Sequence, residues 1–156
     1  MLQLQRRECA VWRVCRPLGT GSLLARTVRM TPEQLRNRTF DFSKQIIQFT
    51  GPLLQQSDTA DIVRQLRRAA CSVSSNYRAA GRARTRKEFT AKIGVVREEA
   101  DEALYWLLLL RDCSLAVGAE LDTLASEAEE LVKIFVKSYA TANKKSGDVR
   151  SNDRPK

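Results

Sequence analysis

A run of acidic residues near the middle of the chain is the feature most like an enzyme site. Four carboxylates fall within five positions: Glu98, Glu99, Asp101 and Glu102. Carboxylates that face the inside of a helical bundle can hold two metal ions, but such sites normally add a Glu-x-x-His motif from each of two helices. The chain has no histidine. We therefore expect no metal ion at this run.

Glu99 borders an apolar stripe, where an unpartnered carboxylate is costly. An arginine of the preceding helix is the natural partner, either Arg68 or Arg78. We take Arg68 and Glu99 as the predicted structural ion pair.

The absence of histidine also removes the usual general base, so Ser-His and Cys-His nucleophilic sites are excluded and only Lys, Tyr or carboxylate chemistry is left. The four cysteines, at positions 9, 15, 71 and 113, form no CxxC pair of the kind that structural zinc sites use. We interpret Cys71 and Cys113 as small buried residues of a cytoplasmic protein. The prediction is a protein without enzymatic activity and without a cofactor.

Cations are concentrated at one predicted turn. Five lie within ten residues: Arg78, Arg82, Arg84, Arg86 and Lys87. Their charge, together with the free amides at the start of the following helix, could bind phosphate groups. The alternatives are a solvated turn and a turn that pairs with acids of a neighbouring subunit. No aromatic residues are interleaved with these cations, so any nucleic-acid binding should be directed to the backbone and weakly selective for sequence.

The formal net charge of +9 is distributed in blocks. Residues 64–97 hold ten Lys or Arg and one acid, and residues 98–130 hold ten acids and one Arg. The protein is thus basic overall and electrically polarised along its sequence, which suits a nucleic-acid partner or pairing between subunits.

Helical periodicity accounts for most of the chain. A capping box and a proline at Thr31-Pro32-Glu33-Gln34 predict a first helix to about residue 50, which Gly51-Pro52 stops. A second amphipathic helix is predicted over residues 59–80, with its apolar stripe beginning at Ile62 and with small residues in its second half that allow another helix to approach closely.

The third helix is predicted to begin with a capping box at Thr85 and Glu88 and to end near Gly118. Its apolar residues repeat in alternating steps of four and three, at positions 89, 93, 96, 100, 103, 107 and 110, which is a coiled-coil-like heptad. A fourth helix is predicted over residues 121–142, with a main apolar row and a second row that includes Val136. Four helices with short connections predict an all-α, antiparallel up-down four-helix bundle.

The domain boundaries follow from the same patterns. Residues 31–143 form the predicted bundle domain, and residues 144–156 a charged tail. Residues 1–30 hold six Arg and one acid and lack helical periodicity, so we expect a disordered or weakly ordered extension from an upstream start, with Met30 as the natural beginning of the protein. The alternative is a transit peptide, which is also rich in Arg and poor in acids. The longest uninterrupted run of Leu and Trp, residues 106–110, is too short to cross a bilayer, so we expect a soluble protein with no membrane partner.

The third helix has more apolar surface than one stripe requires around residues 104–110. Tyr105 and Trp106 lie off the heptad, and Leu108 and Leu109 make the helix apolar on nearly every side. Large amphipathic rings are favoured in protein interfaces. These four residues are the predicted subunit interface of a homo-oligomer.

One stretch of sequence has a recognisable family pattern. It is QLRRAACSVSSNYRAAGRARTRKEF, from Gln65, followed by KIGVVREEADEALYWL, from Lys92. The small-residue helix with Asn76, the Gly81-Arg82 turn and the EEADEALYW segment together resemble the four-helix-bundle family named for proteins encoded within 23S rRNA intervening sequences, over about residues 33–142. Many members have Asn-Ile-Ala-Glu-Gly after the small-residue helix, and this chain lacks that Glu, which places it in a variant branch.

The resemblance implies a homopentameric barrel with no established enzymatic activity. A related pentamer is an accessory factor of diversity-generating retroelements, in which a basic surface contacts nucleic acid and a reverse transcriptase. Two functions therefore stay open. One is an oligomeric accessory protein that binds RNA or DNA backbones, with a protein partner such as a reverse transcriptase. The other is a protein-interaction or scaffold module that binds no nucleic acid.

Overall fold

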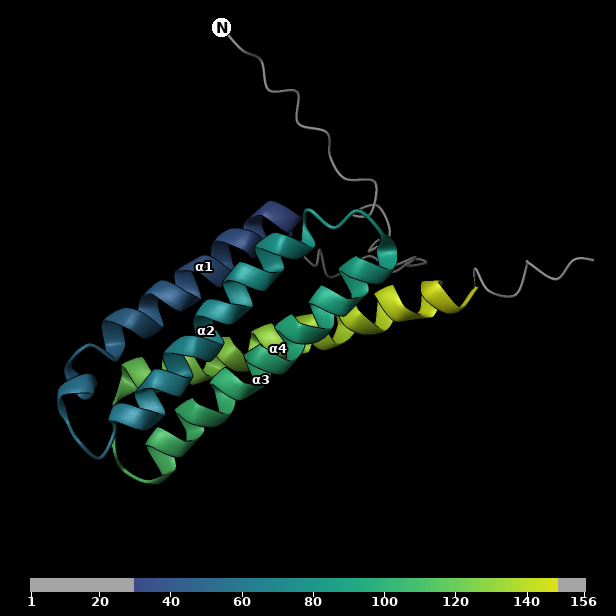
Figure 1. The fold of residues 1–156 in the computed structure, drawn as a ribbon. Helices are drawn as coiled ribbons and strands as arrows, with labels where there is room; N and C mark the ends of the chain where they lie inside the picture. The colour runs from purple at the N-terminus through teal and green to yellow at the C-terminus, as the bar shows by residue number, and fades with distance from the viewer. Residues whose placement is uncertain (1–29, 149–156) are drawn as a thin grey trace, which may run out of the picture.

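The structure, a computed structural model, describes residues 30–148, with side chains up to Lys144. It contains four α-helices and a short 3-10 helix, η2 (Pro52–Gln55), and the described part has no strand. The α-helices are α1 (Pro32–Phe49), α2 (Ala60–Ala80), α3 (Arg86–Asp112) and α4 (Ala119–Asp148). Figure 1 shows each α-helix running antiparallel to the one before it. The prediction of an all-α four-helix bundle is confirmed. The sequence regions 1–29 and 149–156, with Cys9 and Cys15, lie outside the described residues.

The predicted start of α1 is confirmed in detail. The Thr31 hydroxyl accepts a hydrogen bond from the Gln34 amide at 3.1 Å, and the Gln34 side chain accepts one from the Thr31 amide at 2.7 Å. This reciprocal capping box satisfies two of the amides that a helix start leaves unpaired, and Pro32 occupies the first turn. The helix ends at Phe49, immediately before Thr50 and the Gly51-Pro52 pair.

The bundle core is built from the predicted stripes. All seven heptad residues of α3 are buried, from Phe89 to Leu110, as is the main row of α4 from Leu121 to Phe135. The first turn of α2 buries Ala60 and Val63, and Ile62 is only half-buried, so the predicted stripe was wrong at its first residue. The second row of α4 is only partly buried, since Val136 is 47% exposed.

Two predicted helix ends were also wrong. α3 ends at Asp112, six residues before Gly118, because Ser114 adopts a φ of 56° that a helix does not accommodate. Gly118 itself has a φ of 120°, which only glycine adopts readily, and it lies immediately before α4. α4 continues to Asp148, so its last residues, from Lys144, are helical rather than part of a tail.

Both cysteines of the described region are exposed, which corrects the prediction that they are buried. Cys71 lies on α2 between Ala70 and Val73, but the helical rotation turns it away from the stripe that these two form. Cys113 is the residue at the C-terminal cap of α3, where the helix leaves the core.

The largest helix contacts are α2 with α3 and α3 with α4, and α1 with α4 is the smallest contact between neighbouring α-helices. α1 packs on the small residues of α2, as predicted. The Ser43 hydroxyl lies 2.7 Å from the Ala70 carbonyl oxygen and 2.9 Å from the Ser74 hydroxyl. Such distances require the two backbones to approach closely, which large side chains at Ala70 and Ser74 would prevent.

An arginine of α2 completes the C-terminal end of α1. α1 has no basic residue in its own last turn. Arg67 donates from Nε to the Thr50 hydroxyl at 2.6 Å and from its terminal nitrogen to the Ile47 carbonyl oxygen at 2.8 Å. The guanidinium therefore satisfies a carbonyl group that the helix end leaves unpaired, and its charge favours the negative end of the helix dipole.

We predict that Arg67→Ala lowers the free energy of unfolding by about 1–3 kcal/mol, because the buried Thr50 hydroxyl and the Ile47 carbonyl lose a charged donor. Arg67→Lys should recover only part of the loss, because an ammonium lacks the forked geometry. The matched control is Arg64→Ala, one turn earlier, whose partner Asp61 is exposed. Urea unfolding measures all three variants, and equal effects of Arg67→Ala and Arg64→Ala would contradict the prediction.

Candidate functional site

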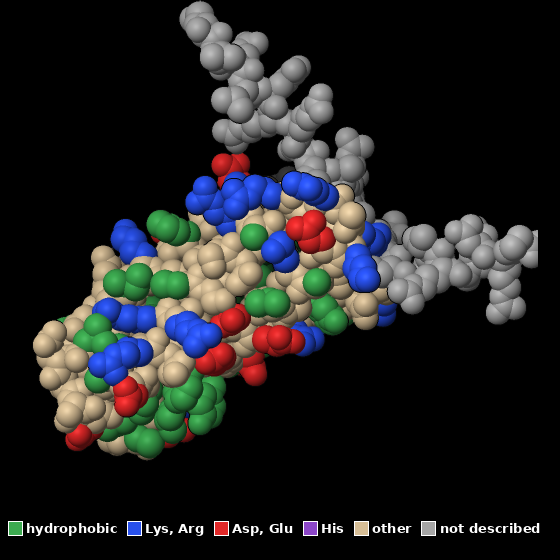
Figure 2. Space-filling view, in the orientation of Figure 1, with side chains coloured by type: hydrophobic (Ala, Val, Ile, Leu, Met, Phe, Trp, Pro, Cys, Tyr) green, Lys and Arg blue, Asp and Glu red, His purple; other side chains and the backbone are tan. Residues whose placement is uncertain are grey.

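The predicted basic cluster lies at one end of the bundle. Arg78 is in the last turn of α2, Arg82 and Arg84 are in the turn that follows, and Arg86 and Lys87 begin α3. The start of α1 and the C-terminal part of α4 lie at the same end (Figure 1). Figure 2 shows Lys and Arg side chains gathered over this end of the molecule.

Four of the five cations are available to a partner. Arg78, Arg82, Arg84 and Lys87 are exposed. Among the ion pairs between described side chains, none involves any of these four. A charge that has no internal partner keeps its full attraction for an external anion. We refer to these four residues as the basic end.

Arg86 was predicted to belong to the basic cluster that could bind phosphate, but its side chain is engaged within the bundle. It is half-buried, and its guanidinium donates from two nitrogens to the Ala142 carbonyl oxygen, each at 3.3 Å. This contact joins the first turn of α3 to the C-terminal part of α4. The side chain therefore contributes to the packing of the two helices.

The amides at the start of α3 are also partly occupied. The Thr85 hydroxyl accepts from the Glu88 amide at 3.1 Å, as predicted, but the Glu88 carboxylate accepts from the Arg84 amide at 3.0 Å and not from that of Thr85. The capping residues thus place a carboxylate within the basic end. An external phosphate would meet the arginine and lysine side chains more readily than these amides.

The predicted interface residues form a band around the solvent side of α3. Tyr105 is 55% exposed, and Trp106, Leu108 and Leu109 are half-buried. The Tyr105 and Trp106 rings meet edge to face with centroids 4.9 Å apart, and the Trp106 indole nitrogen donates to Glu102 at 3.1 Å. These rings are thus held in position while they keep apolar area in contact with solvent.

Arg68 and Glu99 are not among the ion pairs of the described side chains. Arg68 is exposed on α2 and Glu99 is half-buried on α3. Since solvent reaches Glu99, its carboxylate does not require a partner within the chain. In the neighbouring acids, Glu98 accepts from Arg97 at 3.0 Å.

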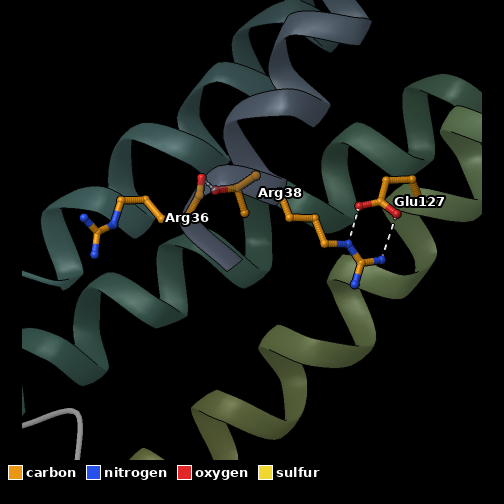
Figure 3. A network of polar contacts seen from close by, with 4 residues as sticks. Arg36, Arg38 and Glu127 are labelled. Carbon is orange, nitrogen blue, oxygen red and sulfur yellow. Dashed lines mark hydrogen bonds and ion pairs between the residues drawn. The ribbon is translucent and has the colours of Figure 1, made fainter. Parts of the chain in front are cut away.

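The ion pair that does cross the bundle joins α1 to α4. Arg38 donates two parallel hydrogen bonds to the Glu127 carboxylate, at 2.6 and 2.7 Å, from side chains that are 27% and 26% exposed (Figure 3). The hydrogen bond to Glu127 raises the pKa of Arg38. This pair was not predicted, because its two residues lie 89 positions apart on helices whose mutual rotation the sequence does not give.

The pair lies in an open groove of about 850 Å³ between α1 and α4. Besides Glu127, the groove is lined by the acids Asp41, Asp122 and Glu130. Its excess of negative charge does not suit a phosphate ligand. Within the described residues, no three Cys, Asp or Glu side chains lie together in a way that could hold a metal ion, and none of the helices there is long and apolar enough to cross a membrane.

Comparison with known families agrees with this fold and with the sequence pattern. The model of the family described as 23S rRNA-intervening sequence protein matches residues 33–137. The chain belongs to this family. No curated protein matches the chain significantly.

A solved structure shares the fold of this family member. It is a protein of unknown function from the S23 ribosomal protein family of Bacteroides thetaiotaomicron, determined at 1.70 Å resolution. The TM-score is 0.63 with 22% sequence identity, and the match covers 67% of this chain and 97% of that one. At this identity the likeness shows the fold.

We predict a favourable coupling of about 1–2 kcal/mol between Arg38 and Glu127, because a half-buried bidentate pair is stronger than the 0.2–1 kcal/mol typical of exposed pairs. The measurement is a double-mutant cycle in urea unfolding with Arg38→Gln and Glu127→Gln. Lys133 and Glu129, an exposed pair within α4, form the control cycle, in which we expect a weaker coupling because solvent screens both charges. A coupling for Arg38 and Glu127 no larger than the control would contradict the prediction.

Proposed function

We propose that this protein is a non-enzymatic, oligomeric protein that binds the phosphate backbone of RNA or DNA at its basic end. The observation that supports this proposal is the gathering of four exposed cations, Arg78, Arg82, Arg84 and Lys87, none of which forms an ion pair with another described side chain. Side chains of this type supply the sequence-independent part of nucleic-acid affinity by displacing condensed counterions.

Oligomerisation would multiply this site. The band of Tyr105, Trp106, Leu108 and Leu109 gives α3 an apolar outer surface that the described part of the chain covers only in part. We propose that it forms the contact between copies, in a closed ring that the family resemblance suggests is a pentamer. Several basic ends on one particle would engage a polyanion simultaneously, so modest contacts in each subunit add to a useful affinity.

A second candidate function is a scaffold in which charged faces of neighbouring subunits pair with each other. Figure 2 shows acidic side chains over α3 and basic side chains on the same face of the molecule. Glu98, Asp101 and Glu102 are exposed on α3, as is Arg68 on α2. In this function the partner is a second copy or another protein, and no nucleic acid binds.

We predict that replacing Arg82, Arg84 and Lys87 by Gln weakens binding to single-stranded RNA, single-stranded DNA and duplex DNA alike. Each lost phosphate contact should reduce the slope of log affinity against log salt by about 0.7 for single strands and 0.9 for duplex. Arg86 is left unchanged because it contacts Ala142. Fluorescence anisotropy over a salt series measures both quantities.

The control for this variant removes the same charge from the opposite end of the bundle, with Arg64, Arg68 and Arg111 replaced by Gln. This control variant should lose less affinity, and its slope of log affinity against log salt should stay close to that of the unmodified protein. If the unmodified protein binds none of the three nucleic acids at low salt, or if both variants behave alike, the basic end is not the binding site.

The proposed subunit contact gives a separate prediction. Tyr105→Lys should shift the sedimentation of the protein from an oligomer towards a monomer, because a charge at a buried apolar contact has no partner. Tyr105 is exposed in the single chain, so the helical content should not change. Val117→Lys, at a residue that is exposed between α3 and α4, is the control. An unmodified protein that sediments as a monomer at micromolar concentration would contradict the proposal.

A further inference from the structure

α1 has a large aromatic side chain on its outer surface. Phe40 is 65% exposed, the highest exposed fraction of the aromatic residues that the structure describes. Ile47, seven residues further along the same helix, is 45% exposed. Residues seven apart lie on nearly the same side of a helix, so the two form an apolar strip along one flank of α1.

Contacts between α1 and α2 locate this flank. Ser43 of α1 meets Ser74 of α2 at 2.9 Å. Phe40 lies one turn before Ser43, and Arg78 lies one turn after Ser74. The two helices are antiparallel (Figure 1), so one turn back along α1 and one turn forward along α2 lead in the same direction. We call the line of contact between these helices the α1–α2 seam. Phe40 and Arg78 therefore lie on the same stretch of the rim of this seam.

Cations flank the aromatic ring on its own helix as well. Arg36 and Lys44 lie four residues before and after Phe40, positions that share its side of the helix. Figure 3 shows the Arg36 side chain pointing away from the one of Arg38, which reaches towards α4. No ion pair between described side chains involves Arg36, Lys44 or Arg78.

Few acids compete for these cations. Asp41, the acid nearest to Phe40 in sequence, lines the groove on the α4 side of α1. Glu33 lies on the flank of Phe40 but seven residues earlier, which is about 10 Å along the helix axis. The rim of the α1–α2 seam, defined by Arg36, Phe40, Lys44 and Arg78, is thus predominantly positive.

An exposed aromatic ring among cations is the arrangement that binds single-stranded nucleic acids, because the ring stacks on a base while the cations contact the adjacent phosphates. A duplex cannot use the ring, since its bases are stacked on each other. No aromatic residue is interleaved with the cations of residues 78–87 in the sequence, because the Phe40 ring belongs to a different helix. Arg78 is also part of the basic end, so the rim and the basic end are continuous.

We infer that the rim of the α1–α2 seam binds single-stranded RNA or DNA, with a base stacked on Phe40 and phosphates held by Arg36, Lys44 and Arg78. This inference rests on the proposed function and names its substrate class. It assigns selectivity for unpaired strands to one residue, whereas the basic end attracts any nucleic acid.

The experiment compares Phe40→Ala, Phe40→Leu and Phe40→Tyr with the unmodified protein. The probes are a labelled 12-nucleotide oligo(U) RNA and a labelled DNA duplex of the same length, each titrated by fluorescence anisotropy. Stacking on one base corresponds to a change of about fivefold to a hundredfold in affinity. We expect Phe40→Ala and Phe40→Leu to bind the RNA more weakly by this factor. Phe40→Tyr should keep the RNA affinity of the unmodified protein, because its ring can still stack.

The duplex affinity and the salt slopes should be unchanged in all three variants, because no charge is removed. If Phe40→Ala keeps its RNA affinity while the Arg82, Arg84 and Lys87 variant binds more weakly, the stacking site is overturned. The proposed function would still stand in that case. An equal loss for RNA and duplex would also overturn the stacking site, as would a change in sedimentation that assigns Phe40 to a contact between subunits. If the unmodified protein binds neither probe, both proposals fail.

Discussion

The burial of one apolar stripe on α3 determines the arrangement of the whole bundle. Its seven heptad residues have almost no contact with solvent, and α3 makes large contacts with both α2 and α4. A stripe with an average period of 3.5 residues keeps the same side of a long helix towards its neighbours, so α3 can pack along its full length. Since a single stripe already satisfies these contacts, the further apolar residues keep area in contact with solvent: Tyr105 is exposed, and Trp106 and Leu109 are only half-buried.

The antiparallel topology then concentrates charge. An up-down bundle brings the start of α1, the end of α2, the start of α3 and the C-terminal part of α4 to the same end of the molecule (Figure 1). Cations that are more than forty residues apart in sequence, such as Arg36 and Arg82, therefore come to the same end. Most of their charge stays available because the ion pairs among the described side chains involve other cations: Glu98 pairs with Arg97, and Glu127 with Arg38.

α1 is attached to the bundle in a different way from the other helices. Apolar residues such as Phe42 and Ile46 are buried, but three polar contacts fix its position: Ser43 with Ser74, Arg67 with Thr50, and Arg38 with Glu127. Two of these contacts face α2 and one faces α4. The contact with α4 is small and leaves an acidic groove, whereas the rim on the α2 side carries Phe40 among cations. The two flanks of one helix thus have opposite electrostatic character.

Local sequence determined the number of α-helices, most of their starts and the α3 stripe, because capping and periodicity act between residues within one or two turns. It did not predict the short 3-10 helix η2. It also located the basic end, whose members are neighbours in sequence. Only the tertiary structure decided that Arg86 turns to Ala142, that Arg67 completes α1, and that Glu127 pairs with Arg38. These outcomes depend on distances between different helices, and the rotation of each helix about its axis, which sets those distances, is fixed only when all the stripes pack together.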